Sequence, residues 1–340
     1  MRAVIARSGL RISELDDLKE QNDAIAEIVR DFENARLAGS VVSKPVVELV
    51  STVEQRIGER ERFEKFRRIP TGMMPLDVDL RGGLGEGELG IVYAAYNVGK
   101  SFFLSQLAIN AAAAGKRALY ITLELSGLEV LGRMESCITG IPSEDLSRRA
   151  PELIEASKGL MRAYSDRLYV LDFPTGSIDV RTVNAIVKRF ECTFGKLDLL
   201  LLDAADNLHV KNSDAIRLEL KSIYTELRAT AQENSIGLWT VSQVNRQGLD
   251  VEVVRGIYSA ESIDKLFIAD VVLSLNQSQS EYPSRLRVWV EKNRRSKKWL
   301  MRACRCDFST GRINMVPGDN IVIDPAQQAA VMDALMAVRA

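Results

Sequence analysis

Residues 89–101 read LGIVYAAYNVGKS, and this stretch decides the fold. Residues 89–94 are apolar or small, as in a buried strand, and residues 101–114 continue without glycine or proline, as in a helix. A Gly-Lys-Ser tripeptide ends the stretch at the point where the helix opens. This strand–loop–helix order has the spacing of a P-loop, except that Ala94 occupies the position where the usual pattern has its first glycine.

The loop carries the groups that bind the phosphates of a nucleotide. Such a site needs backbone N–H groups at a helix N-terminus, a lysine for the β- and γ-phosphate oxygens and a hydroxyl for Mg²⁺. Lys100 and Ser101 supply the last two, so we predict an ATP and Mg²⁺ site. The other nucleotide-binding residues predicted in the loop are Ala94, Asn97, Val98, Gly99 and Phe102.

Three further apolar runs, typical of buried strands, end in a polar side chain: Asp203, Glu124 and Gln243. Ligands of open α/β sheets bind at the carboxyl ends of the strands, so we expect these side chains to meet near the loop. We predict that Asp203 holds Mg²⁺ through water, that Glu124 polarises the attacking water as a general base, and that Gln243 contacts the γ-phosphate. Local sequence alone also allows a helix cap, a solvated carboxylate and a loop amide at these positions.

From residue 76 onward, short apolar runs alternate with helical patterns. The runs are 89–94, 118–123, 168–171, 197–202, 237–242 and 271–275, and the helical segments are 101–114, 128–138, 151–165, 180–191 and 215–233. Parallel strands need crossover connections and read as continuous apolar runs when both faces are buried. The predicted fold class is therefore α/β, with a mostly parallel central sheet flanked by helices. Residues 285–292 and 299–307 predict an antiparallel hairpin at the end of the sheet.

Composition and charge exclude several classes of protein. The 340 residues are 46% hydrophobic and 27% charged, as in a globular protein, and the net charge of -1 gives no sign of a nucleic-acid partner. No apolar run reaches the length of a membrane span, and the N-terminus becomes charged too soon for a signal peptide, so we expect a cytoplasmic protein with no membrane partner. Four scattered cysteines and one histidine, His209, argue against a disulfide framework and a zinc site.

These motifs, in this order, resemble the RecA-like motor domain of DnaB-type replicative helicases, from about residue 69 to about residue 307. The P-loop of that family also commonly begins with alanine, as here at Ala94. Besides the P-loop, Asp203 and the lysine-x-arginine at 292–294, the matching segments are 69–72, 76–77, 82–84, 123–126, 242–246, 261–263 and 269–272. Several matches in the right order are more specific than any one of them.

The resemblance implies a RecA-like P-loop NTPase that uses ATP and Mg²⁺ and forms a hexameric ring of identical subunits on single-stranded DNA. It implies that Glu124 is the catalytic glutamate, that Asp203 is the Walker B aspartate and that Gln243 senses the nucleotide state. Lys292 and Arg294 resemble the cations that each subunit inserts into the ATP site of its neighbour. Travel from 5′ to 3′, a primase or helicase loader as a further partner, and nucleoid association in a bacterial or phage-infected cell follow from the same resemblance.

Three features depart from the family pattern. Ala204, Ala205 and Asp206 follow Asp203, where an aromatic residue is usual. Residues 295–298 read RSKK, where an asparagine-glycine-proline turn is typical. In place of the globular N-terminal domain of the family, we expect a short helical arm.

The sequence predicts three parts. They are a helical N-terminal arm or linker over residues 1–68, a RecA-like ATPase motor domain over 69–316 and a C-terminal tail with a short helix over 317–340. Two stretches of the arm, 13–38 and 46–66, have helical patterns. We expect one of them to pack on the adjacent subunit, and the alternative is that it folds back onto its own domain.

DNA contacts are expected from the segments that follow Asp203 and Gln243, with Lys211, Arg246 and Arg255 as cations for the phosphates. A ring needs positive charge only where the strand threads it, so a net charge near zero is compatible with this function. We predict an ATP-dependent helicase that moves along single-stranded DNA and unwinds duplex at replication forks, with ATP hydrolysed between subunits. The alternative is a RecA-like recombinase or an ATP-regulated DNA-binding assembly factor that does not unwind.

Overall fold

The computed structural model describes residues 57, 67–209, 216–244, 253–255 and 264–320. The predicted arm and the predicted tail helix fall almost entirely outside these ranges, as do Lys211 and Arg246. Contacts divide the chain into Met1–Arg60 and Glu61–Ala340, and the second unit holds the fold. The arm and the tail helix therefore stay predictions.

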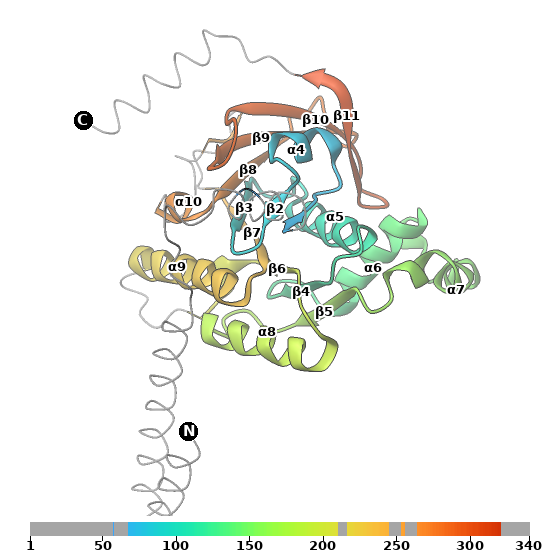
Figure 1. Cartoon of the computed structure of the whole chain (residues 1–340). Coiled ribbons are helices and arrows are strands. Elements are labelled where there is room, and N and C mark those ends of the chain that lie inside the picture. Colours follow the sequence, from blue (N-terminus) through green and yellow to red (C-terminus); the bar gives the residue numbers. More distant parts are fainter. Residues whose placement is uncertain (1–56, 58–66, 210–215, 245–252, 256–263, 321–340) are drawn as a thin grey trace, which may run out of the picture. The chain divides into compact units, whose positions relative to one another are not determined.

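The centre of the fold is a sheet with nine strands in the described part of the chain (Figure 1). Its order is β11 (Arg312–Asn320), β10 (Leu300–Asp307), β9 (Arg285–Asn293), β8 (Val271–Asn276), β3 (Leu89–Ala94), β7 (Gly237–Gln243), β6 (Leu199–Asp203), β4 (Ala118–Thr122) and β5 (Leu168–Asp172). The strands from β8 to β5 pair in parallel, and those from β8 to β11 pair antiparallel. The mostly parallel α/β sheet is confirmed, and the predicted hairpin is β9 with β10. The sequence did not predict β11.

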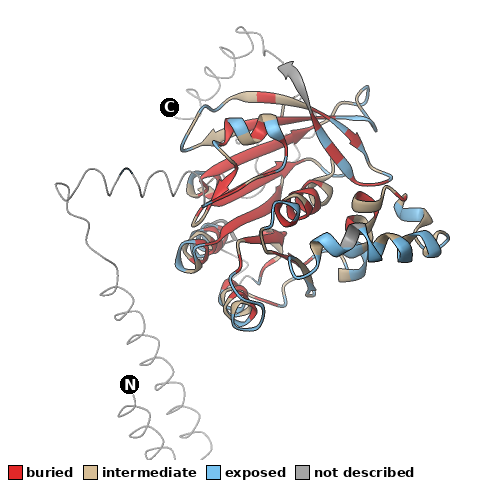
Figure 2. Cartoon of the chain, turned by 45° about the vertical axis from the view of Figure 1, so that its right-hand side comes forward, coloured by how far each residue is buried: buried red, intermediate tan, exposed pale blue. Residues whose placement is uncertain are grey.

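Both faces of the central strands β3, β6, β7 and β8 are buried, which explains their continuous apolar runs. In β3, Leu89, Ile91 and Tyr93 belong to one apolar core and Val92 and Ala94 to another, because successive side chains of a strand alternate between its faces. The four leucines of β6 divide in the same way. Figure 2 shows the buried strands at the centre, with exposure increasing toward the outer helices.

Helices cover both faces. One core includes residues of α4 (Met74–Asp79), α5 (Lys100–Ala113) and α6 (Gly127–Thr139), and the other includes residues of α8 (Val180–Phe194), α9 (Ile216–Asn234) and α10 (Asp264–Ile268). None of the helices in the described ranges has the length and apolar character that a membrane span requires.

Smaller elements connect these layers. They are the strand pair β1 (Arg68–Ile69) and β2 (Leu84–Gly85), the helix α7 (Ala150–Lys158) and the 3₁₀ turns η1 (Ser143–Asp145), η2 (Leu160–Tyr164) and η3 (Ala205–Asn207). The single helix predicted over 151–165 is wrong. Gly159, with φ -104° and ψ -86°, leaves the helical conformation and separates α7 from η2.

The parallel strands bring the segments that follow them to one edge of the sheet. Ala94 at the end of β3 pairs with Gln243 at the end of β7, and Thr122 at the end of β4 pairs with Asp203 at the end of β6. The carboxyl ends of adjacent parallel strands form the usual ligand crevice of an open α/β sheet. The sheet therefore positions the predicted site residues beside one another.

Candidate nucleotide site

The P-loop connects β3 to α5, and its last residues have a fixed geometry. Gly99 has a φ of 94°, in the left-handed region that suits glycine, and an added Cβ there would come within 2.8 Å of the Phe308 ring. Lys100 begins α5, and its Nζ donates to the carbonyl oxygens of Ala95 at 3.0 Å and Ala94 at 3.4 Å. The ammonium group therefore lies over the loop that is predicted to bind phosphate.

A cavity of about 510 Å³ beside the loop contains most of the predicted residues. Its lining consists of Tyr96, Asn97, Gly99, Lys100, Ser101, Phe102, Glu124, Leu125, Arg133, Gln243, Tyr282 and Phe308. Burial lowers the pKa of Lys100, and the negative charges of Glu124, Asp203 and Asp206 oppose that shift. Three carboxylates thus act on the lysine of the P-loop. Three residues predicted for the site, Ala94, Val98 and Asp203, are not part of the cavity lining.

Asp203 is fully buried at the end of β6, and its two carboxylate oxygens differ. Oδ2 accepts a hydrogen bond from the Tyr120 hydroxyl at 2.7 Å, whereas Oδ1 has no hydrogen-bond partner among the described residues. A buried polar atom without a partner is rare and calls for an explanation, such as an ion or a water molecule. Mg²⁺ takes oxygen ligands and keeps several waters. Asp203 Oδ1 and the Ser101 hydroxyl therefore fit this ion.

Glu124 follows β4 on a turn that local hydrogen bonds fix. The Thr122 hydroxyl donates to the Leu125 carbonyl at 2.9 Å and accepts from the Leu125 N–H at 3.0 Å. Ser126 then caps α6, because its hydroxyl accepts from the Glu129 N–H at 3.3 Å and its own N–H donates to the Glu129 carboxylate at 2.9 Å. The turn leaves the Glu124 side chain exposed at the cavity, where a water molecule can reach it.

The cavity also has a largely aromatic wall. Phe102 and Tyr282 flank Phe308, with ring centroids 5.7 and 6.3 Å from its own, and the Arg133 guanidinium lies 4.5 Å from the Phe102 centroid. Flat apolar rings with a cation nearby suit stacking against a nucleobase. Only Phe102 was predicted. The other three come from distant segments without a local motif, so the sequence carried no signal for them.

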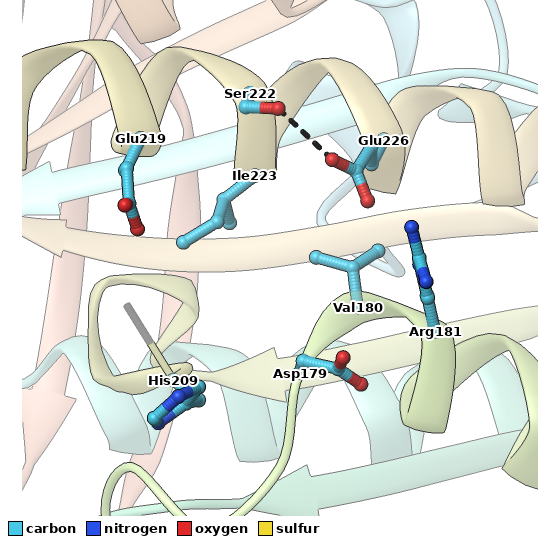
Figure 3. A pocket seen from close by; sticks show the side chains of 8 residues that line it. All are labelled: Asp179, Val180, Arg181, His209, Glu219, Ser222, Ile223 and Glu226. Carbon is cyan, nitrogen blue, oxygen red and sulfur yellow. Dashed lines mark hydrogen bonds between the residues drawn. The ribbon is translucent and has the colours of Figure 1, made fainter. Parts of the chain in front are cut away.

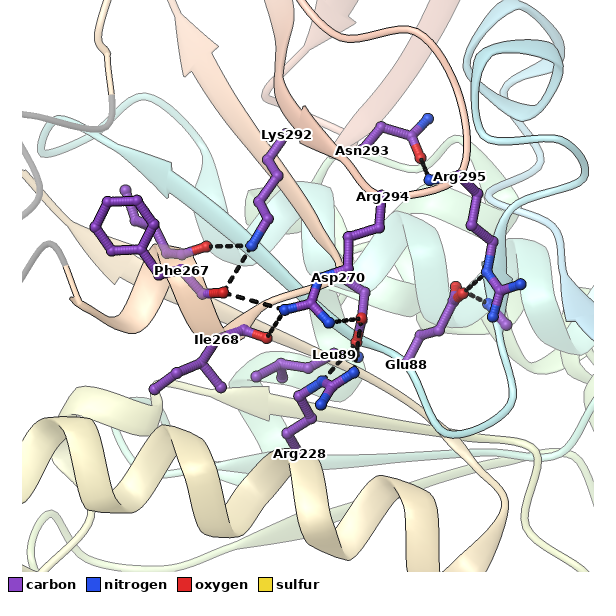
Figure 4. A network of polar contacts seen from close by, with 12 residues as sticks. Glu88, Leu89, Arg228, Phe267, Ile268, Asp270, Lys292, Asn293, Arg294 and Arg295 are labelled. Atoms are coloured by element: carbon purple, nitrogen blue, oxygen red, sulfur yellow. Dashed lines mark hydrogen bonds and ion pairs between the residues drawn. The ribbon is translucent and has the colours of Figure 1, made fainter. Parts of the chain in front are cut away.

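Arg294 does not reach this cavity but lies at the amino end of β3 (Figure 4). Its Nη1 lies 3.2 Å from Asp270 Oδ1, and Asp270 Oδ2 accepts from the Leu89 N–H at 3.0 Å. The six residues of β3 rise about 3.3 Å each, so roughly 17–20 Å separate this cluster from the P-loop of the same chain. The residues predicted as inter-subunit cations are thus remote from the site of their own chain.

Lys292, in β9, lies beside Arg294, and both side chains contact the last turn of α10. Lys292 Nζ donates to the carbonyl oxygens of Leu266 at 3.0 Å and Phe267 at 2.7 Å, and Arg294 Nη2 donates to those of Phe267 at 3.2 Å and Ile268 at 3.4 Å. Burial, together with the charge of Arg294, lowers the pKa of Lys292 to about 8. The last carbonyl groups of a helix have no partner within the helix, so they are available to these cations.

Of the three predicted DNA-binding residues, Arg255 is the one that falls within the described ranges. Its Nε donates to the Glu291 carboxylate at 2.8 Å, and its guanidinium lies 4.9 Å from the centroid of the Trp289 ring. Trp289 Nε1 donates to the same carboxylate at 2.7 Å. The charge of Arg255 is therefore neutralised within the protein, and binding of a phosphate requires this ion pair to open.

A second, smaller cavity of about 260 Å³ lies between α8 and α9 (Figure 3). Asp179, Arg181, Glu219, Glu226 and the exposed His209 are among its lining residues. His209 follows η3, and its backbone N–H donates to the Ile178 carbonyl at 2.8 Å. Within the described ranges, no group of three or more His, Cys, Asp or Glu side chains is arranged to hold a metal ion.

The fold and the site define a class of protein. A P-loop at the end of a central strand, with polar residues at the ends of neighbouring parallel strands, is the arrangement of a RecA-like P-loop ATPase. Residues 68–299 match the family described as the DnaB-like helicase C terminal domain, and the chain belongs to that family.

Individual relatives agree with this assignment. Over 229 residues the chain is 28% identical to a protein named "DnaB-like replicative helicase" from Enterobacteria phage T4, a match that covers 64% of this chain and 48% of that protein. The chain spans about half the length of the curated relatives it matches, 48% and 51% for two of them.

Two solved structures share the fold. One is described as an "ATPase Domain" (TM-score 0.68, 16% identity, covering 78% of this chain and 99% of that one). The other is "The Structure Of A DnaB-Like Replicative Helicase And Its Interactions With Primase" (TM-score 0.73, 18% identity, covering 93% of this chain and 75% of that one). At these identities the likeness concerns the fold alone.

Proposed function

We propose that this chain is an ATP-driven DNA helicase that moves along single-stranded DNA and unwinds duplex at replication forks, as a ring of identical subunits. The observation that carries the proposal is the meeting of Lys100, Ser101, Glu124 and Gln243 in one cavity, in a chain that belongs to a helicase domain family. The proposed motor domain spans residues 69–316. Six subunits, travel from 5′ to 3′, and a primase or a loader as partner in a bacterial or phage-infected cell are the finer parts of the proposal.

The cavity residues have separate tasks in hydrolysis. Lys100 exchanges two carbonyl oxygens of the loop for oxygens of the β- and γ-phosphates. Ser101 and, through water, Asp203 would hold Mg²⁺, and the ion would supply positive charge that neutralises the phosphates. Glu124 accepts a proton from the attacking water, and Gln243 contacts the γ-phosphate.

The remaining cations of each site come from the next subunit in this proposal. Lys292 and Arg294 lie roughly 17–20 Å from their own P-loop, so a single chain cannot use them on its own nucleotide. Arginine fingers contribute about 10³–10⁵ to the rate where they occur. A lone subunit is therefore a poor ATPase.

The DNA strand passes through the centre of the proposed ring. Lys211, Arg246 and Arg255 contact its phosphates, and Arg255 does so after leaving Glu291. Contacts with phosphates track the backbone and carry no base sequence. Sequence-specific binding is not part of the proposal.

Strand displacement tests the proposal against the recombinase alternative. The full chain is expected to release the labelled strand of a forked DNA with ATP and Mg²⁺, and Lys100→Ala is expected to release none. A recombinase would instead coat a single strand and promote pairing of complementary strands. Pairing without displacement by the native chain would favour that alternative and exclude the helicase.

Tyr120→Phe is expected to raise the Mg²⁺ concentration needed for nucleotide binding. The Tyr120 hydroxyl holds Asp203 Oδ2 at 2.7 Å and so leaves Oδ1 to face the ion. A hydrogen bond to a charged group contributes about 1.5–3 kcal/mol, which corresponds to roughly 10- to 150-fold, so the half-saturating Mg²⁺ concentration should rise by about tenfold or more. Fluorescence of labelled ADP during Mg²⁺ titration measures this directly. Tyr169→Phe, on β5, is the control, and equal Mg²⁺ requirements in the two variants would contradict the role of Tyr120.

A further inference from the structure

The short helix α10 has polar contacts with two separate parts of the molecule. Its Lys265 side chain reaches the edge of the sheet that carries the nucleotide site, and its last carbonyl oxygens accept hydrogen bonds from Lys292 and Arg294. The proposed hydrolysis does not use Lys265. A charged side chain in such a position requires an explanation.

Lys265 is fully buried, with 0% of its side chain exposed. Its Nζ lies 3.2 and 3.3 Å from the two carboxylate oxygens of Asp206 and 5.6 Å from the centroid of the Tyr224 ring. Burying an ammonium group is very costly unless it is paired, and replacing a buried ion pair by apolar residues often leaves stability unchanged or improved. The pair is therefore better explained by what it positions than by the stability it adds.

Three elements hold the Asp206 carboxylate. The Tyr224 hydroxyl on α9 donates to Oδ1 at 2.8 Å, the Ser242 hydroxyl on β7 donates to Oδ2 at 2.7 Å, and Lys265 on α10 contacts both oxygens. Both oxygens of Asp206 therefore have protein donors, and these donors come from three different elements. A network that is satisfied in this way is rigid and specifies one arrangement.

The Asp206 carboxylate belongs to the nucleotide edge of the sheet. Asp206 lies in η3, three positions after Asp203, and its charge acts on the pKa of Lys100. Ser242 directly precedes Gln243, the predicted nucleotide sensor. A displacement of the end of β6 or of β7 therefore moves the Asp206 carboxylate. Helix α10 moves with it, because a buried ion pair is costly to separate.

The other end of α10 sets the position of the two inter-subunit cations. The carbonyl oxygens of Leu266, Phe267 and Ile268 accept from Lys292 and Arg294 at 2.7–3.4 Å. Figure 4 shows both side chains converging on these carbonyl groups. The position of α10 thus determines where Lys292 and Arg294 lie relative to the ATP site of the neighbouring subunit.

We propose that Lys265 is a positioning residue that couples the nucleotide edge of a subunit to the cations that this subunit lends to its neighbour. The Lys265–Asp206 pair holds α10 to the sheet edge, and α10 fixes where Lys292 and Arg294 lie. The inference rests on the proposed function, in which these cations complete the ATP site of the next subunit.

A mixing experiment separates the inference from the proposed function. The acceptor is the Arg294→Ala subunit, which keeps its P-loop. The donor is the Lys100→Ala subunit, which keeps its cations while its own site is silent. In the mixture, the donor is expected to restore ATP hydrolysis by the acceptor. The donor is then modified by Asp206→Asn together with Lys265→Met, or by Ser242→Ala, which removes one hydrogen bond from the carboxylate without changing a charge.

A misplacement of a catalytic group by about 1 Å lowers the rate by up to roughly 100-fold. The donor with Asp206→Asn and Lys265→Met is therefore expected to restore about tenfold less ATP hydrolysis than the unmodified donor. The reduction should lie in kcat, and KM for ATP should not change. A Lys116→Met donor, which loses a lysine 3.8 Å from Asp198, is the control and restores as much as the unmodified donor. Thermal unfolding shows whether each donor is folded. If the donor with both changes does not fold, the Ser242→Ala donor tests the inference, and it is expected to restore measurably less hydrolysis than the unmodified donor. Equal restoration by all folded donors overturns the inference, whereas no restoration by any donor overturns the proposed function instead.

Discussion

Lys100→Ala and Glu124→Gln are each expected to reduce ATP hydrolysis by at least about 10²-fold while the fold stays intact. Lys100 supplies the cation over the P-loop, where its Nζ donates hydrogen bonds to the Ala94 and Ala95 carbonyl oxygens of the loop. Glu124 is exposed at the cavity, so loss of its charge costs the fold little. Without Lys100, the phosphates lose a positive charge. Without Glu124, the attacking water loses its general base.

Labelled ADP distinguishes the two variants. Lys100→Ala weakens ADP binding, because the lysine contacts phosphate directly, whereas Glu124→Gln keeps its affinity, because the base acts on water alone. Steady-state hydrolysis with and without single-stranded DNA, together with thermal unfolding, completes the measurement. Glu155→Gln, on an exposed position of α7, is the matched control for the loss of a carboxylate. DNA-stimulated hydrolysis retained by both variants would refute the assigned roles.

Arg294→Ala is expected to lower the hydrolysis rate of assembled subunits by about 10³-fold or more, with the affinity for labelled ADP unchanged. The fold should tolerate the change, because Asp270 keeps two hydrogen bonds from Arg228 at 3.0 Å each and one from the Leu89 N–H at 3.0 Å. The buried carboxylate is therefore not left unpaired. Steady-state rates and ADP titrations measure the effect.

Lys297→Ala is the control for Arg294→Ala, since it removes an exposed cation from the same connection between β9 and β10. Only the Arg294 change is expected to slow hydrolysis. A loss of ADP affinity that parallels the loss of rate would assign Arg294 to the structure of its own subunit and not to the neighbouring site.

The sheet edge could be predicted because its logic is local. Asp203, Glu124 and Gln243 each follow a short run of apolar residues, and runs of this kind are strands buried on both faces. Once the strands are parallel, their carboxyl ends share an edge, and the polar residues at those ends come together. The position of Lys100 could be predicted in the same way, because the strand–loop–helix pattern is also formed by residues that are neighbours in the sequence.

Contacts between distant segments could not be predicted. The Tyr120 hydroxyl finds Asp203 across 83 positions, and Lys265 finds Asp206 across 59, and neither pair has a periodic signal or a motif. The ion pair of Arg255 with Glu291 is a third example, because a lone arginine in a loop reads as an available cation. Such contacts depend on how the layers pack, which single-sequence patterns do not contain.

The central claim is that each ATP site is shared between two subunits, and mixing two inactive variants tests it most directly. Lys100→Ala keeps the cations and lacks the P-loop lysine, whereas Arg294→Ala has the opposite defect. In a closed ring, random mixing joins the two intact halves at about one interface in four, so the mixture should recover up to about a quarter of the native hydrolysis rate. Mixed rings that form but hydrolyse no faster than either variant alone would contradict a shared site.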